Sequence, residues 1–222
     1  MTNAFADIAL VHWFAALGGP GGAAPSEEVE IQRLVESARR GDRGAARDLY
    51  RQHVGPTFRA VRSLVRDESE AEDVVQEAFV SALASLHRYR PQPGARFASW
   101  LAAIALNVAR RRARWWRRVA PDPAQAGLDL EPSADPSPDE ALDHAQRRAA
   151  LLKALGELPT REREIVSLRY GAELTAAEVG SALGLGEANV RKICERQRRH
   201  LLERLGELLG DDEHSPEAES TP

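Results

Sequence analysis

The sequence predicts an all-α protein with two helical domains joined by an acidic, proline-rich linker. Ala, Leu, Arg and Glu dominate the 222 residues, aromatic residues contribute 5%, and no alternating strand pattern persists, as is typical of helical proteins. Apolar residues recur at helical spacing before residue 119 and again after residue 139. Between these positions the chain has no Lys or Arg but many Asp, Glu and Pro residues, which indicates an extended segment between two folded units.

Composition restricts the class of protein further. The formal net charge is -4 and hydrophobic residues make up 43% of the chain, so its length permits two small cores. Cys194 is the single cysteine, which excludes a disulfide framework and favours a reducing compartment. We therefore expect a cytoplasmic protein in which Cys194 is a small buried hydrophobe, with redox sensing as the alternative.

Residues 1–25 are predicted to be a flexible N-terminal extension. The apolar run at 8–17 lacks a basic segment before it and is too short to cross a bilayer, so neither a signal peptide nor a membrane helix is expected. Gly and Pro residues at 18–25 then form a flexible connection. The run is either a disordered extension or a short helix that docks elsewhere.

Residues 26–118 are predicted to form the first domain, a bundle of four helices. The first helix ends at the Gly41-Asp42 pair, and the second reaches residue 65 with a weak point at Pro56. The third is expected to start with a capping box of Ser69 and Glu72.

An apolar stripe follows in the third helix and includes Phe79, which is expected in the core. Pro91, Pro93 and Gly94 predict a loop, after which a fourth helix covers 97–118.

Residues 119–139 are assigned to the linker, 140–209 to the second domain and 210–222 to a disordered acidic tail. In the second domain, a capping box of Thr175 and Glu178 opens a helix that stops at Gly184. A long helix begins at Glu187. Helix, glycine-containing turn and helix predict a helix-turn-helix. The linker is either a plain connector or a negatively charged, extended segment that mimics nucleic acid.

A block of arginines without any acidic residue covers 86–118, interleaved with aromatic residues. Arginines neutralise phosphates, and aromatic rings stack on unpaired bases for roughly 1–3 kcal/mol each. A solvated basic helix face would carry compensating acids four residues away, and the block has none. Trp100 is expected in the core, and at least one of Trp115 and Trp116 is expected to be exposed. The nine arginines are Arg88, Arg90, Arg96, Arg110, Arg111, Arg112, Arg114, Arg117 and Arg118.

Three ordered segments carry a family resemblance: AEDVVQEAFVSAL, RFASWLAAIALNVARRRAR, and the stretch from ALGELPTREREIVSLRY to the end of the long helix. Together they resemble the sigma-70 family of RNA polymerase sigma factors, in its two-domain extracytoplasmic-function (ECF) subfamily. The resemblance implies that 26–118 is sigma region 2, which binds core polymerase and recognises and melts the -10 element. It implies that 140–209 is region 4, which recognises the -35 element.

The resemblance also implies roles for individual residues. Core polymerase would be bound, at the clamp of its largest subunit, by Asp73, Gln76 and Glu77. The melted -10 strand would be bound by Arg88, Tyr89, Arg90, Arg96, Asn107, Arg110, Arg111, Arg114, Trp115 and Arg118. The -35 duplex would be bound by Asn189, Arg191, Lys192, Glu195, Arg196 and Arg199.

The resemblance further implies that region 4 contacts the flap of the second polymerase subunit and that an anti-sigma factor is a possible partner. No membrane insertion is expected. No cofactor, metal site or catalytic residue is expected either, because the sequence has no Gly-rich phosphate-binding loop and no His, Cys and Asp residues at the spacing of metal ligands. One alternative is a free-standing helix-turn-helix regulator that acts on duplex DNA without polymerase. Another is a protein that only sequesters polymerase or a partner.

Overall fold

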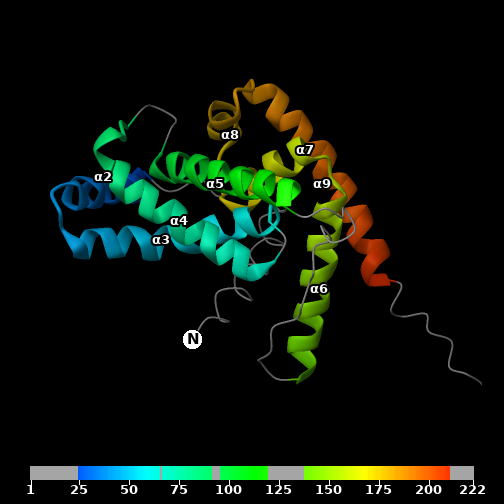
Figure 1. The fold of residues 1–222 in the computed structure, drawn as a ribbon. Helices are drawn as coiled ribbons and strands as arrows, with labels where there is room; N and C mark the ends of the chain where they lie inside the picture. Colours follow the sequence, from blue (N-terminus) through cyan, green and yellow to red (C-terminus); the bar gives the residue numbers. More distant parts are fainter. Residues whose placement is uncertain (1–24, 66, 92–95, 120–137, 211–222) are drawn as a thin grey trace, which may run out of the picture.

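The computed structural model describes residues 25–65, 67–91, 96–119 and 138–210. Every regular element in these ranges is helical, which confirms the predicted all-α class (Figure 1). Most of the N-terminal extension, the linker from 120 to 137 and the tail from 211 onward lie outside the described residues. The elements are α2 (Pro25–Arg39), α3 (Arg43–Arg62), α4 (Glu68–Ser85), η1 (Leu86–Arg88), α5 (Phe97–Val119), α6 (Pro138–Glu157), α7 (Thr160–Val166), η3 (Ser167–Gly171), α8 (Ala176–Leu183) and α9 (Glu187–Gly210).

The break between α2 and α3 lies where the sequence predicts it. Gly41 has a φ of 96°, in the left-handed region that favours glycine. Asp42 is the N-cap of α3, and its Oδ1 accepts hydrogen bonds from the backbone N–H groups two and three residues ahead, at 2.8 and 3.2 Å. The helix continues through Pro56 and ends at Arg62, so the predicted weak point does not interrupt it.

The predicted capping box of Ser69 and Glu72 is wrong. The N-cap of α4 is Asp67, whose Oδ1 accepts a hydrogen bond from the backbone N–H of Glu70 at 2.7 Å. Asp and Ser are equally good N-caps. Because Asp67 comes first and takes that role, Ser69 already lies inside the first turn of the helix.

The first core is enclosed by α2, α3, α4 and α5. Phe79 is 4% exposed, as the apolar stripe of its helix predicts. Tyr89 and Phe97 pack edge to face with ring centroids 5.7 Å apart, and Trp100 lies partly buried beside them. This cluster of rings holds the start of α5 against the rest of the bundle.

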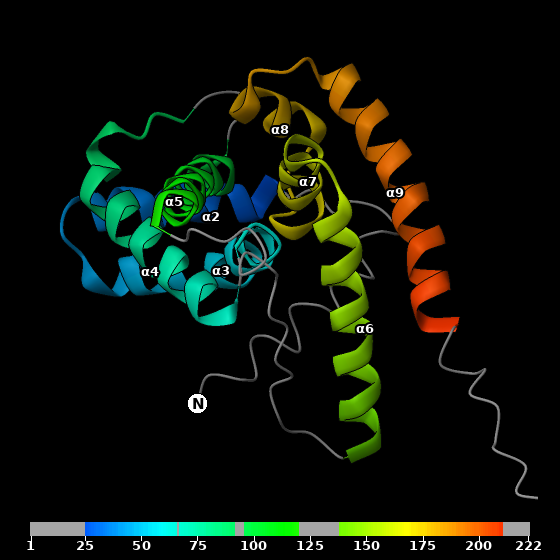
Figure 2. The same ribbon diagram turned by 45° about the vertical axis from the view of Figure 1, so that its right-hand side comes forward.

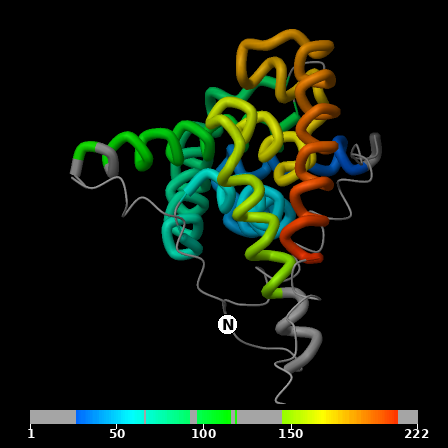
Figure 3. The backbone as a smooth tube through the Cα atoms, turned by 90° about the vertical axis from the view of Figure 1, so that its right-hand side faces the viewer, coloured from blue at the N-terminus to red at the C-terminus, as the bar shows by residue number. Residues whose placement is uncertain are grey.

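The second core lies among α6, α7, η3, α8 and α9, and also takes in side chains of the first bundle. Leu151, Ile165 and Val179 are completely buried in it. Figure 2 and Figure 3 show α6 and α9 running alongside each other. Ala60 of α3 and Leu106 of α5 belong to the same cluster. The two helical units are therefore joined by a common apolar cluster in this arrangement.

η3 packs directly against the backbone of α3. A Cβ added to Gly171 would lie 2.7 Å from the backbone N and Cα of Ala60, so the approach requires glycine. Beside this contact, the Ser63 and Ser167 hydroxyl oxygens are 2.5 Å apart and buried. η3 is a π-helical turn, a local irregularity that here coincides with the close approach of Gly171 to α3.

Candidate nucleic-acid interface

α5 separates an apolar face from a polar one. Its inner side chains, such as Leu101 and Val108, are 1% and 2% exposed. The opposite face carries polar residues at positions i, i+4, i+7 and i+11, which lie in one line along a helix. These exposed residues are Asn107, Arg111, Arg114 and Arg118. Trp115, beside this line, is 47% exposed, in agreement with the prediction for one of the paired tryptophans.

The segment before α5 presents arginines but not its tyrosine. Arg88 and Arg90 are exposed, whereas Tyr89 is 2% exposed and lies in the first core. The Tyr89 hydroxyl accepts a hydrogen bond from Gln32 Nε2 at 3.1 Å. Its ring is therefore inaccessible to a base in this arrangement. Residues 92–95 of the predicted loop lie outside the described residues.

Arg39 holds this segment in place, a role that the sequence did not indicate. Its Nη2 donates to the Tyr89 carbonyl at 2.6 Å and its Nε to the Leu86 carbonyl at 3.2 Å. Both bonds join residues about fifty positions apart in the chain. A tertiary contact of this kind has no local sequence signal.

Two arginines of the block are paired with acids of the second helical unit. Arg96 donates to both carboxylate oxygens of Glu178, from Nε at 2.7 Å and from Nη2 at 2.9 Å. Arg110 donates to both oxygens of Glu164, each at 2.6 Å. Bidentate pairs of this type are the strongest ion pairs that arginine makes with carboxylates.

These pairs shift the ionisation of their members. Hydrogen bonding to Glu178 raises the pKa of Arg96, and hydrogen bonding to Glu164 raises that of Arg110. Burial alone would raise the pKa of Glu178, but hydrogen bonds from Arg96 and Thr175 bring it below its ordinary value. Glu178 is therefore a charged carboxylate although it is 2% exposed.

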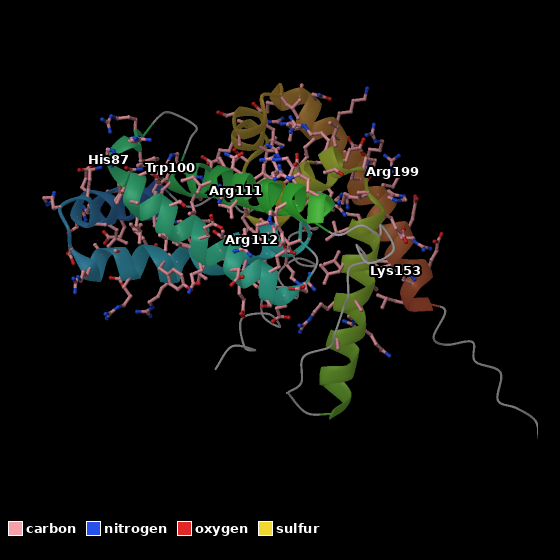
Figure 4. All side chains as sticks on the ribbon, viewed as in Figure 1. His87, Trp100, Arg111, Arg112, Lys153 and Arg199 are labelled. Atoms are coloured by element: carbon pink, nitrogen blue, oxygen red, sulfur yellow. The ribbon has the colours of Figure 1, made fainter. Side chains whose placement is uncertain are left out.

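Two further arginines meet the acids predicted to bind polymerase. Arg111 forms an ion pair with Glu77, and Arg112 Nη1 lies 3.1 Å from Asp73 Oδ2. Figure 4 shows Arg111 and Arg112 on the part of α5 that runs beside α4. The side chains of Asp73 and Arg111 are more than half exposed, so each pair contributes little to stability.

The helix-turn-helix is built by α8 and α9, and its local signals are confirmed. The Thr175 side chain accepts from the backbone N–H of Glu178 at 3.2 Å, and Glu178 Oε2 accepts from the Thr175 N–H at 2.8 Å, which completes the predicted capping box. Gly184 ends α8 with a φ of 68°. The backbone therefore turns into α9 where the sequence predicts it.

All six residues predicted for the -35 element lie exposed on α9: Asn189, Arg191, Lys192, Glu195, Arg196 and Arg199. The residues between them that face inward, Val190 and Cys194, are 0% and 4% exposed. Arg199 points outward, away from the first bundle (Figure 4). Because the apolar residues face inward and the polar residues face outward, the second helix of the helix-turn-helix has one continuous polar surface.

Glu162 of α7 is a contact that sequence reasoning missed. Its carboxylate accepts a hydrogen bond from Arg196 at 2.8 Å and another from the buried amide of Gln197. Glu162 thereby ties the middle of α9 to the helix in front of the helix-turn-helix. No local sequence pattern predicts these hydrogen bonds, because the partners lie 34 and 35 residues apart in the chain.

Cys194 is buried, as expected from its apolar position. Burial raises the pKa of its thiol to about 11, so the thiol stays protonated at neutral pH. Within the described ranges, no group of His, Cys, Asp and Glu residues is arranged to hold a metal ion. Among those same residues, no helix is long and apolar enough to cross a bilayer.

Comparison with known proteins identifies both helical units. Residues 49–119 match the family model of sigma-70 region 2, and residues 154–203 match that of sigma-70 region 4. The RNA polymerase sigma factor CarQ of Myxococcus xanthus is 34% identical over 174 residues, which cover 78% of this chain and 97% of CarQ. The ECF RNA polymerase sigma factor BldN of Streptomyces coelicolor is 30% identical over 86% of this chain and 70% of BldN.

A solved structure has a similar fold. It contains the sigma factor RpoE of Bartonella quintana in complex with the anti-sigma factor NepR, and its matched chain is 22% identical with a TM-score of 0.57. The match covers 75% of this chain and 97% of that chain. Taken with the two family models and the sequence relatives, these observations lead to one conclusion: the chain belongs to the sigma-70 family, among the ECF RNA polymerase sigma factors, which direct promoter-specific transcription initiation.

Proposed function

We propose that this sigma factor reads the -35 element as duplex with α9 and holds the melted -10 strand with the basic face of α5. One observation carries the proposal: the polar residues of α9 and those of α5 form two separate exposed surfaces on different helical units. Each surface has a chemistry suited to one form of DNA. A free-standing regulator needs only the first.

The surface of α9 suits a major groove. Arg191 and Arg196 can each bind a guanine through two hydrogen bonds, and Glu195 can accept from a cytosine amino group. Each such contact discriminates between bases by roughly 1–3 kcal/mol. Lys192 and Arg199 are exposed on the same helix and suit phosphates. Asn189, near the start of the helix, can pair with an adenine edge.

The surface of α5 suits a single strand. The line of Asn107, Arg111, Arg114 and Arg118 can follow a phosphate backbone, and Trp115 offers an exposed ring for stacking at the end of that line. Arg88, Arg90 and Arg96 come from the segment in front of α5. Since the Tyr89 ring is buried, we assign stacking to Trp115 and give Tyr89 the task of anchoring the segment.

We assign the contact with core polymerase to the outer face of α4. Asp73, Gln76 and Glu77 lie on that face, and Val80, which is 66% exposed, extends it by one turn. Exposed acids beside an apolar side chain suit a basic partner helix with an apolar seam. Arg111 and Arg112 already pair with Glu77 and Asp73, which supports the view that this face attracts cationic groups.

Further assignments follow from the same proposal. Region 4 would contact the flap of the second polymerase subunit, and an anti-sigma factor is an expected partner. The RpoE chain of similar fold was solved with such a factor. Because bacterial RNA polymerase works in the cytoplasm, we place the protein there. The acidic linker and the tail lie outside the described residues, and we assign no role to them.

A reconstituted transcription assay tests the proposal. The purified protein is mixed with core RNA polymerase and a pool of genomic promoter fragments, and transcript starts are sequenced. We expect new starts that share paired -35 and -10 elements and that disappear with Arg191→Ala/Arg196→Ala. The matched control, Arg33→Ala/Arg51→Ala, removes two exposed arginines that lie on α2 and α3. If duplex DNA is bound but core polymerase gains no starts, the free-standing regulator is the correct account.

A further inference from the structure

Helix α2 contacts the segment that carries Arg88 and Arg90, although the two are about fifty residues apart in the chain. The end of α2 lies beside the end of α4, where the chain passes through η1 toward α5 (Figure 1). The match to sigma-70 region 2 begins at residue 49, so α2 lies outside that match. The contribution of α2 therefore has to be inferred from its contacts.

Arg39, the last residue of α2, supplies hydrogen-bond donors to the end of α4 and η1. Leu86 is the C-cap of α4 and Tyr89 is the C-cap of η1. The final carbonyl groups of a helix lack the donors that a further turn would supply, and they form the negative end of its dipole. Arg39 Nη2 donates to the Tyr89 carbonyl at 2.6 Å, and its Nε donates to the Leu86 carbonyl at 3.2 Å. A guanidinium therefore meets this helix end with the favourable sign of charge.

Two side chains on one face of α2 hold Tyr89 from both ends. The guanidinium of Arg39 is itself fixed, because its Nη1 donates to Glu36 Oε1 at 2.7 Å. Gln32 lies seven residues before Arg39, on the same face of the helix. Its Nε2 donates to the Tyr89 hydroxyl at 3.1 Å and to Glu28 Oε1 at 3.0 Å. The carbonyl and the hydroxyl of Tyr89 are thus both bonded to α2.

Arg88 and Arg90, the chain neighbours of Tyr89, keep their charges available. Both are exposed, and within the part of the chain that the structure describes neither forms an ion pair with a carboxylate. Arg90 Nη1 donates to the carbonyls of His87 and Tyr89, at 2.6 and 3.1 Å. A fixed Tyr89 between these two residues fixes the backbone from which both guanidinium groups extend. Donors that are already in place bind a ligand without the cost of ordering them.

On the basis of the proposed function, we propose that α2 is part of the -10 site. Arg39 and Gln32 are positioning residues that hold Tyr89 and do not contact DNA themselves. By fixing Tyr89, they set Arg88 and Arg90 where the phosphates of the melted strand arrive. The -35 surface belongs to α9 of the other helical unit, so its affinity for duplex DNA does not depend on α2.

The expected effect is a loss of affinity for the melted strand alone. Without the contacts from α2, the strand has to order two arginine side chains as it binds. Immobilising two long side chains lowers affinity by about tenfold. The phosphate contacts themselves still form once the strand is bound, so the affinity is reduced and not abolished.

Holoenzyme assembled from core RNA polymerase and wild-type or variant sigma factor is used for the test. It is titrated with a fluorescein-labelled single strand that carries the -10 element recovered from the transcript starts, and with the -35 duplex. We expect Arg39→Ala to bind the strand about tenfold more weakly and the duplex equally well. Arg33→Ala is the matched control, because Arg33 is exposed on the same helix and pairs with Glu30 three residues earlier, as Arg39 pairs with Glu36. Equal affinity of wild type and Arg39→Ala for the strand would overturn the proposal.

A double-mutant cycle distinguishes positioning from a general loss of stability. In holoenzyme that carries Arg88→Ala/Arg90→Ala, the groups that Arg39 positions are gone, so adding Arg39→Ala should not weaken strand binding further. If Arg39→Ala lowers the strand affinity by the same factor in both backgrounds, Arg39 does not act through these arginines and the proposal is wrong.

Two milder variants keep the test valid if Arg39→Ala does not fold. Arg39→Lys keeps the charge but loses the planar fork that reaches two carbonyl groups at once, so an intermediate strand affinity is expected. Gln32→Met keeps the length of the side chain and removes the hydrogen bond to the Tyr89 hydroxyl, which should weaken strand binding by about threefold. Wild-type affinity of both folded variants would contradict the proposal.

Transcription separates failure of this inference from failure of the proposed function. If wild-type holoenzyme neither binds the strand nor produces specific starts, the proposed function is wrong. If wild-type holoenzyme does both and Arg39→Ala matches it, the function stands and the role of α2 is wrong. The expected result is specific starts from both proteins, with a lower yield from Arg39→Ala and an unchanged yield from Arg33→Ala.

Discussion

The turn of the helix-turn-helix depends on the absence of a side chain at Gly180. A Cβ at this position would lie 2.6 Å from the carbonyl oxygen of Leu185, closer than real side chains come. The Leu185 N–H in turn donates to the Gly180 carbonyl at 2.8 Å, so the two backbones are bonded together. Because the opposing atom belongs to the backbone, no side-chain rotation can relieve the contact.

Gly180→Ala is therefore expected to destabilise the protein. Alanine inside a helix is favoured over glycine by about 1 kcal/mol. Overpacking typically costs about 1–3 kcal/mol, and a clash with backbone belongs at the upper end, near 3 kcal/mol. The net loss is about 2 kcal/mol in the free energy of unfolding, which lowers Tm by roughly 4–8 °C for a chain of this length.

Thermal unfolding followed by circular dichroism measures the change, with Gly206→Ala as the matched control. A Cβ on Gly206 of α9 meets no atom within 4 Å, so this variant should gain up to about 1 kcal/mol. Gly180→Ala should also weaken binding of the -35 duplex, because the turn that sets the angle of α9 has to shift. An equal rise of Tm in both variants would refute the argument from close packing.

Three further predictions concern single side chains. Burial, with a smaller effect of the Arg96 charge, lowers the pKa of His53 to about 4. The unfolded chain binds a proton at this residue near pH 6.5, whereas the folded chain binds it only near pH 4. The free energy of unfolding therefore decreases as the pH falls from about 6.5 to about 4. Urea unfolding should therefore show about 2 kcal/mol less stability at pH 5 than at pH 8, and His53→Phe should reduce that difference. Asp67→Ala should cost about 1 kcal/mol through loss of the α4 cap, and Ser69→Ala much less, in the same urea assay. The Cys194 thiol should react with a thiol reagent at pH 8 only after unfolding, and fast labelling of folded protein would contradict its burial.

Local signals account for most of the secondary structure. The Gly41-Asp42 break, the Thr175 and Glu178 capping box and the left-handed Gly184 all depend on residues within four positions of one another. The start of α4 differs from its prediction because Asp67 and Ser69 are both good caps and Asp67, which comes first, takes the role. Pro56 does not break α3, since packing of both halves compensates for one missing hydrogen bond.

The candidate site is less predictable. The exposed residues of α9 follow from helical spacing, and so does the line from Asn107 to Arg118 on α5. Burial of Tyr89 does not follow from the sequence, because its position among arginines suggests exposure. Its hydroxyl is held by Gln32, which lies 57 residues away in the chain.

The sequence by itself determined the helices, the helix-turn-helix and a block of arginines that contains no acidic residue. Only the tertiary structure supplied those acids: Glu77 from α4, Glu164 from α7 and Glu178 from α8. The physical reason is that helical periodicity and capping act over a few residues, whereas charge pairing acts through space. The number of arginines that a basic surface leaves unpaired therefore depends on which helices the fold brings against it.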